Sequence, residues 1–426
     1  MHSHYGFDRI TKRVRILEWR LVNMKSISFV HAADIHLDSP FVGMQKLPPE
    51  LYRRIKDSTF VAFRNLVNYC LNEKVDFLLI SGDLYDGEDR SIRAQIRLQQ
   101  EFSKLQNANI RVFVIHGNHD HLAGTWSHIE MPENVHIFGP EPELVEFTTG
   151  NGMQVSIAGF SYQKKHEAHN KLNLFPQPAG DLKIGMLHGH DGTSQNHLTY
   201  APFTISDLVQ MPYDYWALGH IHTRQILSEA PYVIYPGNIQ GRHINETGEK
   251  GFIHVEWTTH QQNITFIPCQ DIEWRIEKIH ISDSTQPDEL FQACKQLMER
   301  LINESERLFL RIEIHSESDI HPSTLLLIES GQLLELLQEE DTLNHEHFIW
   351  IFDMKLIQTQ TTALSLANHP FLYSLEKVIE SADVKQELEP LFLHKKASRY
   401  LQDVPELEYE QLKAEAKELL LKLLNR

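Results

Sequence analysis

The sequence predicts a mixed α/β (α+β) fold in which a two-layered sheet is covered by helices. Apolar strands alternate with helical segments before residue 135, and short strands follow one another after it. In addition, polar motifs come directly after several of the apolar strands. Ligands of such folds bind at the carboxyl ends of strands, so these motifs indicate a candidate site.

The first half begins with a β-α-β unit. Residues 25–31 (KSISFVH) and 76–80 (DFLLI) carry the apolar residues of buried strands. Between them, residues 48–73 open with two prolines and then place apolar residues at helical spacing. A helix over 89–107 and a strand over 111–115 (RVFVI) repeat the unit.

The rest of the chain contains two further patterns. Short alternating or apolar runs such as MQVSIAGF, LKIGMLH and YWALGH predict a strand-rich half after residue 135. After residue 276, a strand, a helix over 286–303, the strand RLFLRIEIH, a helix over 323–338 and the strand FIWIFDMKL predict a compact α/β module. The pattern of residues 406–426 predicts an amphipathic helix, which packs either on this chain or on a partner.

Composition is typical of a folded soluble protein, with 41% hydrophobic and 23% charged residues among 426. The three scattered cysteines, Cys70, Cys269 and Cys294, build no disulfide framework and fit a reducing cytoplasm. No run approaches the ~20 apolar residues of a membrane span, so we expect no membrane contact. The formal charge of −18 is mostly C-terminal, with 28 acidic against 15 basic residues in 276–426, and therefore does not exclude a nucleic-acid partner.

Five short motifs place carboxylate, imidazole or amide groups after apolar strands. They are Asp34-Ile35-His36, Gly82-Asp83-Leu84-Tyr85-Asp86, Gly117-Asn118-His119-Asp120, His188-Gly189 and Gly219-His220-Ile221-His222. A lone histidine after a strand is usually structural, but five such motifs in this order are strong evidence for a metal site. These ligand types suit Mn²⁺, Fe²⁺ or Zn²⁺, and a pair of ions needs a bridging ligand, for which Asp83 is the natural candidate. The neighbouring glycines allow sharp turns and close backbone approach.

The order of these motifs resembles that of the calcineurin-like metallophosphoesterases, over residues 25 to about 257. The stretches FVHAADIHLDSPF and LLISGDLYDGEDRS and the C-terminal α/β module are most similar to the SbcD-type DNA repair exonucleases, in the YhaO-type branch. The resemblance implies a four-layer α/β/β/α sandwich with a C-terminal α/β capping module and terminal helices. We therefore expect four regions: an N-terminal extension outside the fold (1–24), a catalytic domain (25–275), a capping domain (276–360) and a helical partner-binding region (361–426).

The same resemblance implies two divalent metal ions. One set of ligands is Asp34, His36, Asp83 and His222, and the other is Asp83, Asn118, His188 and His220. Manganese is the expected metal, with iron, zinc and magnesium as alternatives. His119 is the implied general acid, and Asp120 either orients it or shapes the turn. Asp86 stands where some nucleases of the family carry a helper histidine, so that helper is absent.

The leading hypothesis is a manganese-dependent 3′–5′ DNA exonuclease of DNA repair, which cleaves phosphodiester bonds by two-metal hydrolysis. The resemblance implies a protein that works with an SbcC-like ATPase subunit through its C-terminal helices, and it is compatible with a homodimer. The cysteine usage places this protein in the cytoplasm as an expectation. The alternative is a phosphodiesterase or phosphatase for a cyclic nucleotide or nucleotide conjugate, which the acidic balance favours and the C-terminal extension disfavours. A scaffold with a spent metal site is a third hypothesis, and the complete set of ligands argues against it.

Overall fold

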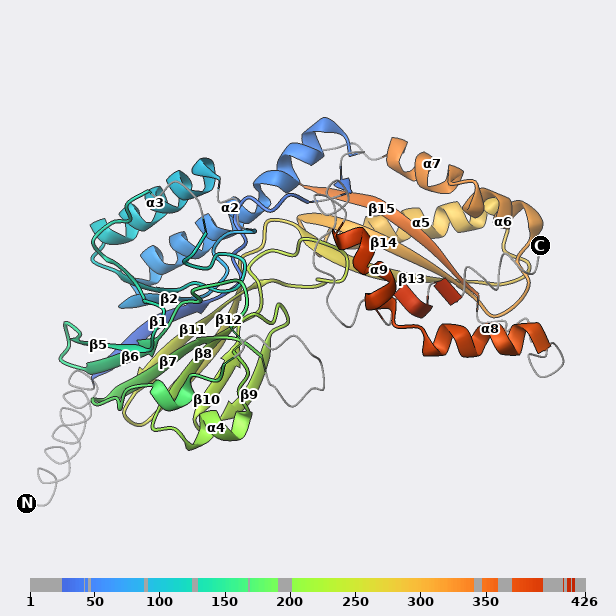
Figure 1. The fold of residues 1–426 in the computed structure, drawn as a ribbon. Helices are drawn as coiled ribbons and strands as arrows, with labels where there is room; N and C mark the ends of the chain where they lie inside the picture. The colour runs from blue at the N-terminus through green and yellow to red at the C-terminus, as the bar shows by residue number, and fades with distance from the viewer. Residues whose placement is uncertain are drawn as a thin grey trace, which may run out of the picture. The chain divides into compact units, whose positions relative to one another are not determined.

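The computed structural model describes residues 25–41, 43–44, 47–87, 91–124, 129–167, 169–190, 201–340, 347–358, 370–393, 409, 412–414 and 416–417. The predicted N-terminal extension, residues 1–24, lies outside these residues, as does most of the predicted helix over 406–426. Figure 1 shows the order of the elements along the chain.

The first six-stranded sheet contains the strands predicted in the first half of the sequence. They are β1 (Ser26–Ala32), β2 (Phe77–Ser81) and β3 (Arg111–Ile115), which pair in parallel. The full order is β12-β11-β1-β2-β3-β4, where β4 (Val135–Ile137) is parallel and β11 (Gly251–Thr258) and β12 (Gln262–Pro268) are antiparallel. Because β1, β2 and β3 are parallel, their carboxyl ends meet at one edge of the sheet.

Helices α2 (Pro49–Glu73) and α3 (Ile92–Asn107) cover one face of this sheet (Figure 1). Pro49 stands in the first turn of α2, where its missing N–H costs no hydrogen bond. The side chain of Ser91 caps α3 by accepting a hydrogen bond from the backbone N–H of Ala94. Buried side chains of the two helices, such as Phe63 and Leu98, join those of β2 and β3 in one core.

The second six-stranded sheet has the order β5-β6-β7-β8-β10-β9. Its strands are β5 (Glu143–Thr148), β6 (Gln154–Gly159), β7 (Leu182–His188), β8 (Tyr215–Gly219), β9 (Gln225–Glu229) and β10 (Tyr232–Tyr235). A core that includes Phe29 and Phe77 from the first sheet and Ile184 and Tyr215 from the second fills the space between the sheets. The short helix α4 (Ile205–Gln210) packs on the opposite face, over Trp216. The layers run α/β/β/α, and the predicted fold class is confirmed.

A three-stranded sheet follows, with the order β13-β14-β15. Its elements are β13 (Glu273–Ile281), α5 (Pro287–Leu301), β14 (Arg307–Ser316), α6 (Pro322–Glu329), α7 (Gln332–Glu340) and β15 (Phe348–Gln358). The prediction of one helix over 323–338 is wrong, because Gly331 takes a φ of +78°. A left-handed residue cannot continue a right-handed helix, so α6 ends and α7 begins on either side of it.

The chain divides into two compact units. The first comprises Met1–Ile276, Leu301–Leu310 and Leu343–Trp350, and the second Glu277–Arg300, Arg311–Thr342 and Ile351–Arg426. The second unit includes α8 (Pro370–Ser381) and α9 (Val384–Leu393). Among the described residues, no helix has the length and apolar character needed to cross a membrane.

Candidate metal centre

The five motifs lie in loops that follow β1, β2, β3, β7 and β8, and hydrogen bonds join the first two of these loops. The backbone N–H of Asp34 donates to the carbonyl of Gly82 at 3.1 Å, and that of His36 donates to the carbonyl of Asp83 at 3.0 Å. A positive φ, which residues other than glycine rarely adopt, occurs at Asp34, His36, Asp83 and His220. Strain of this kind persists only where the surroundings impose it, and it gathers at functional sites.

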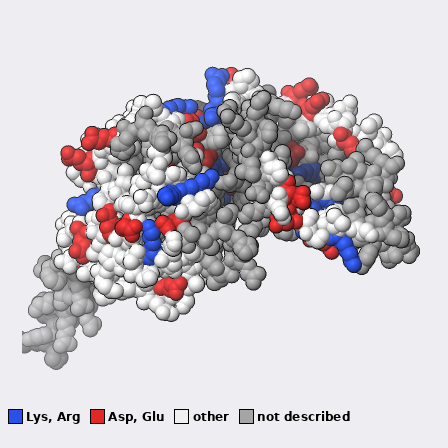
Figure 2. Space-filling view, viewed as in Figure 1, with Lys and Arg blue, Asp and Glu red and all other residues white. Residues whose placement is uncertain are grey.

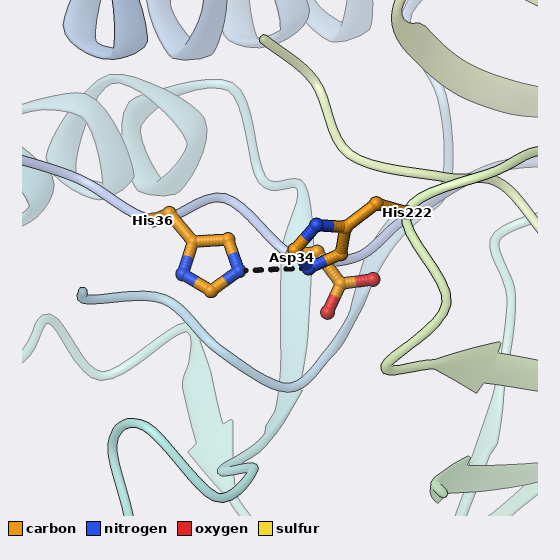
Figure 3. A group of neighbouring side chains, drawn as sticks. All are labelled: Asp34, His36 and His222. Atoms are coloured by element: carbon orange, nitrogen blue, oxygen red, sulfur yellow. Dashed lines mark hydrogen bonds between the residues drawn. The ribbon is translucent and has the colours of Figure 1, made fainter. Parts of the chain in front are cut away.

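The first group of converging side chains is Asp34, His36 and His222, shown in Figure 3. Their potential ligand atoms all lie within 4.8 Å of one another, and the Nε2 atoms of His36 and His222 are 3.2 Å apart. His222 donates its Nδ1 proton to Glu246 Oε1 at 2.6 Å, because a carboxylate oxygen can only accept. Neutral His222 therefore presents the lone pair of Nε2 to Asp34 and His36.

The second group is Asp34, Asp83 and His188, and Asn118 adjoins it. His188 Nδ1 lies 3.0 Å from the carbonyl oxygen of Ser81, which only accepts, so the proton is on Nδ1. The lone pair of Nε2 then faces Asn118 Oδ1 at 3.0 Å and Asp83 Oδ2 at 3.5 Å. Three acceptors that face one another in a buried place need a cation or a proton between them, and carboxylate, imidazole and amide oxygen together fit a metal ion.

His220 completes the predicted ligands. Its ring centroid is 5.2 Å from that of His188, and its backbone N–H donates to both oxygens of Asp34 at 3.1 Å. The structure thus brings all seven predicted metal ligands to one place: Asp34, His36, Asp83, Asn118, His188, His220 and His222.

Glycines make this convergence sterically feasible. A Cβ atom on Gly117 would lie 2.3 Å from Asp83 Oδ1 and 2.6 Å from His188 Nε2. A Cβ atom on Gly219 would lie 1.8 Å from the carbonyl oxygen of Ser81. Only a hydrogen atom fits at these positions, so the glycines in the motifs are required by packing around the ligands.

A third group joins His36 and His119 to Asp86. Asp86 Oδ1 lies 3.7 Å from His36 Nδ1 and 3.6 Å from His119 Nδ1. Sequence reasoning missed this role of Asp86, although the residue stands inside a motif already singled out. The sequence signal for this role is the second carboxylate of the motif GDLYD. The loop after β2 places this carboxylate at the same edge of the sheet as the other motifs.

The two sequence interpretations of Asp120 can now be compared with its contacts. Its carboxylate accepts hydrogen bonds from the backbone N–H groups of Leu84 (2.8 Å) and Gly117 (2.7 Å) and lies 2.9 Å from His116 Nδ1. These bonds join the loops that follow β2 and β3, which is the role of a turn residue. His119 is more accessible than Asp120: 31% of the His119 side chain is exposed, and none of the Asp120 side chain is.

Comparisons with known proteins identify the family of this chain. The family model for calcineurin-like phosphoesterases matches residues 27–224. The uncharacterized metallophosphoesterase YhaO of Bacillus subtilis (strain 168) is 38% identical over 404 residues, which are 93% of this chain and 98% of that protein. This chain belongs to the calcineurin-like metallophosphoesterases. The superfamily predicted from the motifs is confirmed.

Other relatives of this metallophosphoesterase are named for a role in DNA repair. The DNA double-strand break repair protein Mre11 of Methanocaldococcus jannaschii is 28% identical over 63% of this chain and 74% of that protein. Mre11 of Archaeoglobus fulgidus is 22% identical over 78% of this chain and 80% of that protein. These matches support the predicted DNA repair branch. Among solved structures, a dimetal phosphatase from Danio rerio matches with 15% identity and a TM-score of 0.33, over 57% of this chain and 99% of that one.

Burial sets the protonation of the metallophosphoesterase site. Burial and the neighbouring Asp83 raise the pKa of Asp34 well above its ordinary value, and burial above all raises the pKa of Asp83 to about 7. Burial also lowers the pKa of His188 to about 4 and holds that of His220 well below its usual range. The imidazoles are therefore neutral ligands, while the two carboxylates resist ionising together unless cations accompany them.

Proposed function

We propose that this metallophosphoesterase is a manganese-dependent DNA exonuclease of DNA repair that degrades its substrate in the 3′–5′ direction. The observation that carries the proposal is the convergence of carboxylate, imidazole and amide donors in a chain whose relatives include Mre11 repair proteins. Mixed oxygen and imidazole donors suit Mn²⁺, and Fe²⁺, Zn²⁺ or Mg²⁺ remain alternatives.

In this proposal two divalent ions share the site. Asp34, His36, Asp83 and His222 would hold one ion, and Asp83, Asn118, His188 and His220 would hold the other. When bound there, the ions supply positive charge that offsets the charge developing on the phosphate oxygens. The hydrogen bonds that His188 and His222 donate from Nδ1, to the carbonyl of Ser81 and the carboxylate of Glu246, keep both rings in the tautomer whose Nε2 can bind a metal ion.

His119 is the proposed general acid. It is the part-exposed histidine at the edge of the buried cluster, and its Nδ1 faces Asp86 at 3.6 Å. An acceptor beside Nδ1 favours the orientation in which Nε2 points away from Asp86, and from there it can protonate the leaving oxygen of a phosphodiester. Asp120 contributes indirectly, by fixing the turn that carries His119.

The proposal extends to substrate and partners. Figure 2 shows Lys and Arg side chains among Asp and Glu on the face in view, and only the Lys and Arg can pair with the phosphates of DNA. Residues 361–426 would bind an SbcC-like ATPase subunit, and α8 carries an exposed apolar residue, Val378, on which such a contact can form. Residues 276–360 would cap the catalytic domain of residues 25–275, in a cytoplasmic protein that can form a homodimer.

The test is hydrolysis of linear duplex DNA, labelled at either end, beside bis-p-nitrophenyl phosphate. Each reaction is run with Mn²⁺ and with EDTA, using wild type, His119→Ala and the matched control His136→Ala. His136 is an imidazole outside the site that faces Glu143 with 40% of its side chain exposed. We expect wild type and the control to cut both substrates with Mn²⁺ only, with loss of DNA from the 3′ end.

Two results would overturn parts of this proposal. Cleavage of the small ester without cleavage of DNA by the full chain would remove the nuclease assignment and favour the small-molecule alternative. If His119→Ala hydrolysed both substrates as fast as wild type, the assignment of His119 as general acid would be wrong.

A further inference from the structure

An arginine lies between two buried carboxylates beside the metal centre. Arg242 Nη1 forms an ion pair with Asp86 Oδ2 at 3.2 Å, and Nη2 donates a hydrogen bond to Glu246 Oε1 at 3.5 Å. All three side chains are shielded from solvent, with exposed fractions of 12%, 9% and 6% in the order Arg242, Asp86 and Glu246. Asp86 belongs to the loop after β2, whereas Arg242 and Glu246 belong to the segment before β11, so the guanidinium joins two distant parts of the chain.

Each of the two carboxylates also faces a histidine. Glu246 Oε1 accepts the Nδ1 proton of His222 at 2.6 Å, and Asp86 Oδ1 lies 3.7 Å from His36 Nδ1. Other donors hold the carboxylates in place. Ser39 Oγ donates to Asp86 at 2.6 Å, and Asn238 Nδ2 donates to Glu246 at 2.9 Å.

This arrangement determines which ring nitrogen is free. The hydrogen bond to Glu246 keeps the proton of His222 on Nδ1, so its Nε2 carries a lone pair. Asp86 lies beyond hydrogen-bond distance of His36 Nδ1, and its negative charge favours a proton on the ring nitrogen that faces it. The Nε2 atoms of His36 and His222 are the two that lie 3.2 Å apart beside Asp34. The carboxylates can do this only while ionised, and in a buried place two ionised carboxylates need a partner of opposite charge. Arg242 supplies a charge that stays positive at any working pH.

We propose that Asp86, Arg242 and Glu246 form a carboxylate–guanidinium–carboxylate clamp that positions His36 and His222, before metal binds, as ligands of one of the two ions. The inference rests on the metal assignment of the proposed function, not on its DNA substrate. The three residues are positioning residues, because they act through the histidines.

The experiment measures metal binding, not cleavage. Full-length wild type, Arg242→Gln, Arg242→Lys and Glu246→Gln are titrated with Mn²⁺ by calorimetry, and bound metal is counted by mass spectrometry. In parallel, proteins with ¹⁵N-labelled histidine report the imidazole tautomers by NMR. The matched control is Arg275→Gln, because Arg275 also joins two carboxylates, Glu273 at 2.9 Å and Glu304 at 3.1 Å, outside the metal centre.

Removing a group that orients a metal ligand typically weakens metal affinity by about 10- to 100-fold. We expect Arg242→Gln and Glu246→Gln to weaken one Mn²⁺ site by that factor, to leave the other site near its wild-type affinity, and to change the tautomer signals of His36 or His222. Lysine offers charge without the planar fork, so Arg242→Lys should be intermediate. The control should match wild type.

The clamp is refuted if both glutamine variants bind two ions with wild-type affinity and unchanged histidine signals. It is also refuted if the metal binding of Arg242→Gln is normal but its KM for bis-p-nitrophenyl phosphate rises, since Arg242 would then contact the substrate. If Arg242→Gln fails to fold, the Mn²⁺ affinity and the histidine signals of Glu246→Gln decide whether the clamp exists. Failure to cut DNA would leave all these readouts unaffected, so the two proposals fail separately.

Discussion

Replacing Gly117 by alanine should disrupt the metal centre and leave the fold intact. The added Cβ would lie 2.3 Å from Asp83 Oδ1, whereas ordinary contact begins at 3.4 Å, so the carboxylate must move by about 1.1 Å, the difference between the two distances. Asp83 cannot swing away freely, because Oδ1 accepts a hydrogen bond from the backbone N–H of His119 at 3.0 Å. His188 is likewise held by Ser81.

Metal ligands tolerate errors of about 0.2 Å, and a misplacement of ~1 Å at a catalytic group costs on the order of 100-fold in rate. We therefore expect Gly117→Ala to bind less Mn²⁺ and to hydrolyse bis-p-nitrophenyl phosphate about 100-fold more slowly than wild type. Gly117 has no left-handed φ, so alanine imposes no backbone strain there. The steric clash in this buried place should still cost about 1–3 kcal/mol of stability, so the unfolding temperature should fall modestly while the protein stays folded.

The assay combines metal analysis after dialysis against Mn²⁺, ester hydrolysis and thermal unfolding. Gly139→Ala is the matched control, because a Cβ atom at Gly139 meets nothing within 4 Å and its φ is not left-handed either. If Gly117→Ala retains the metal content and rate of Gly139→Ala, then Asp83 and His188 are not placed as ligands in the way inferred here.

Three further predictions follow from the same contacts. Because burial raises the pKa of Asp83 to about 7 and lowers that of His188 to about 4, a proton on Asp83 competes with metal below pH 7. Apparent Mn²⁺ affinity should thus fall by about tenfold per pH unit between about pH 7 and pH 5, and calorimetry showing a flat profile would contradict this. Asp271 is fully buried and pairs with Arg54 and Arg307, so Asp271→Ala should lower the free energy of unfolding in urea by about 3 kcal/mol with Mn²⁺ content unchanged. An unchanged urea midpoint would show that neighbours compensate. In Asp120→Asn, an NH₂ group would face a backbone N–H that now donates to a carboxylate oxygen. This substitution should lower the free energy of unfolding in urea by about 2 kcal/mol. A urea midpoint equal to that of wild type would contradict this prediction.

Local sequence patterns predicted most of the fold. The apolar runs at 25–31, 76–80 and 111–115 became β1, β2 and β3 within a residue or two, and the segment 48–73 became α2 (Pro49–Glu73). These elements are encoded by neighbouring residues, whose spacing determines which face is buried. The break between α6 and α7 was missed, because a glycine at residue 331 is compatible with a helix until its actual φ is known.

The sequence by itself determined the family, the order of the motifs and the seven candidate ligands, because each motif is a short string with the glycines and donors that its loop requires. Only the tertiary structure decided which donors face one another. The contacts of Asp86 with His36 and His119, and of Glu246 with His222, join loops that are far apart in the chain. Such pairings depend on the register and packing of two sheets, and no local sequence pattern predicts them. For the same reason, the position of Arg242 between Asp86 and Glu246 appears only in the folded chain.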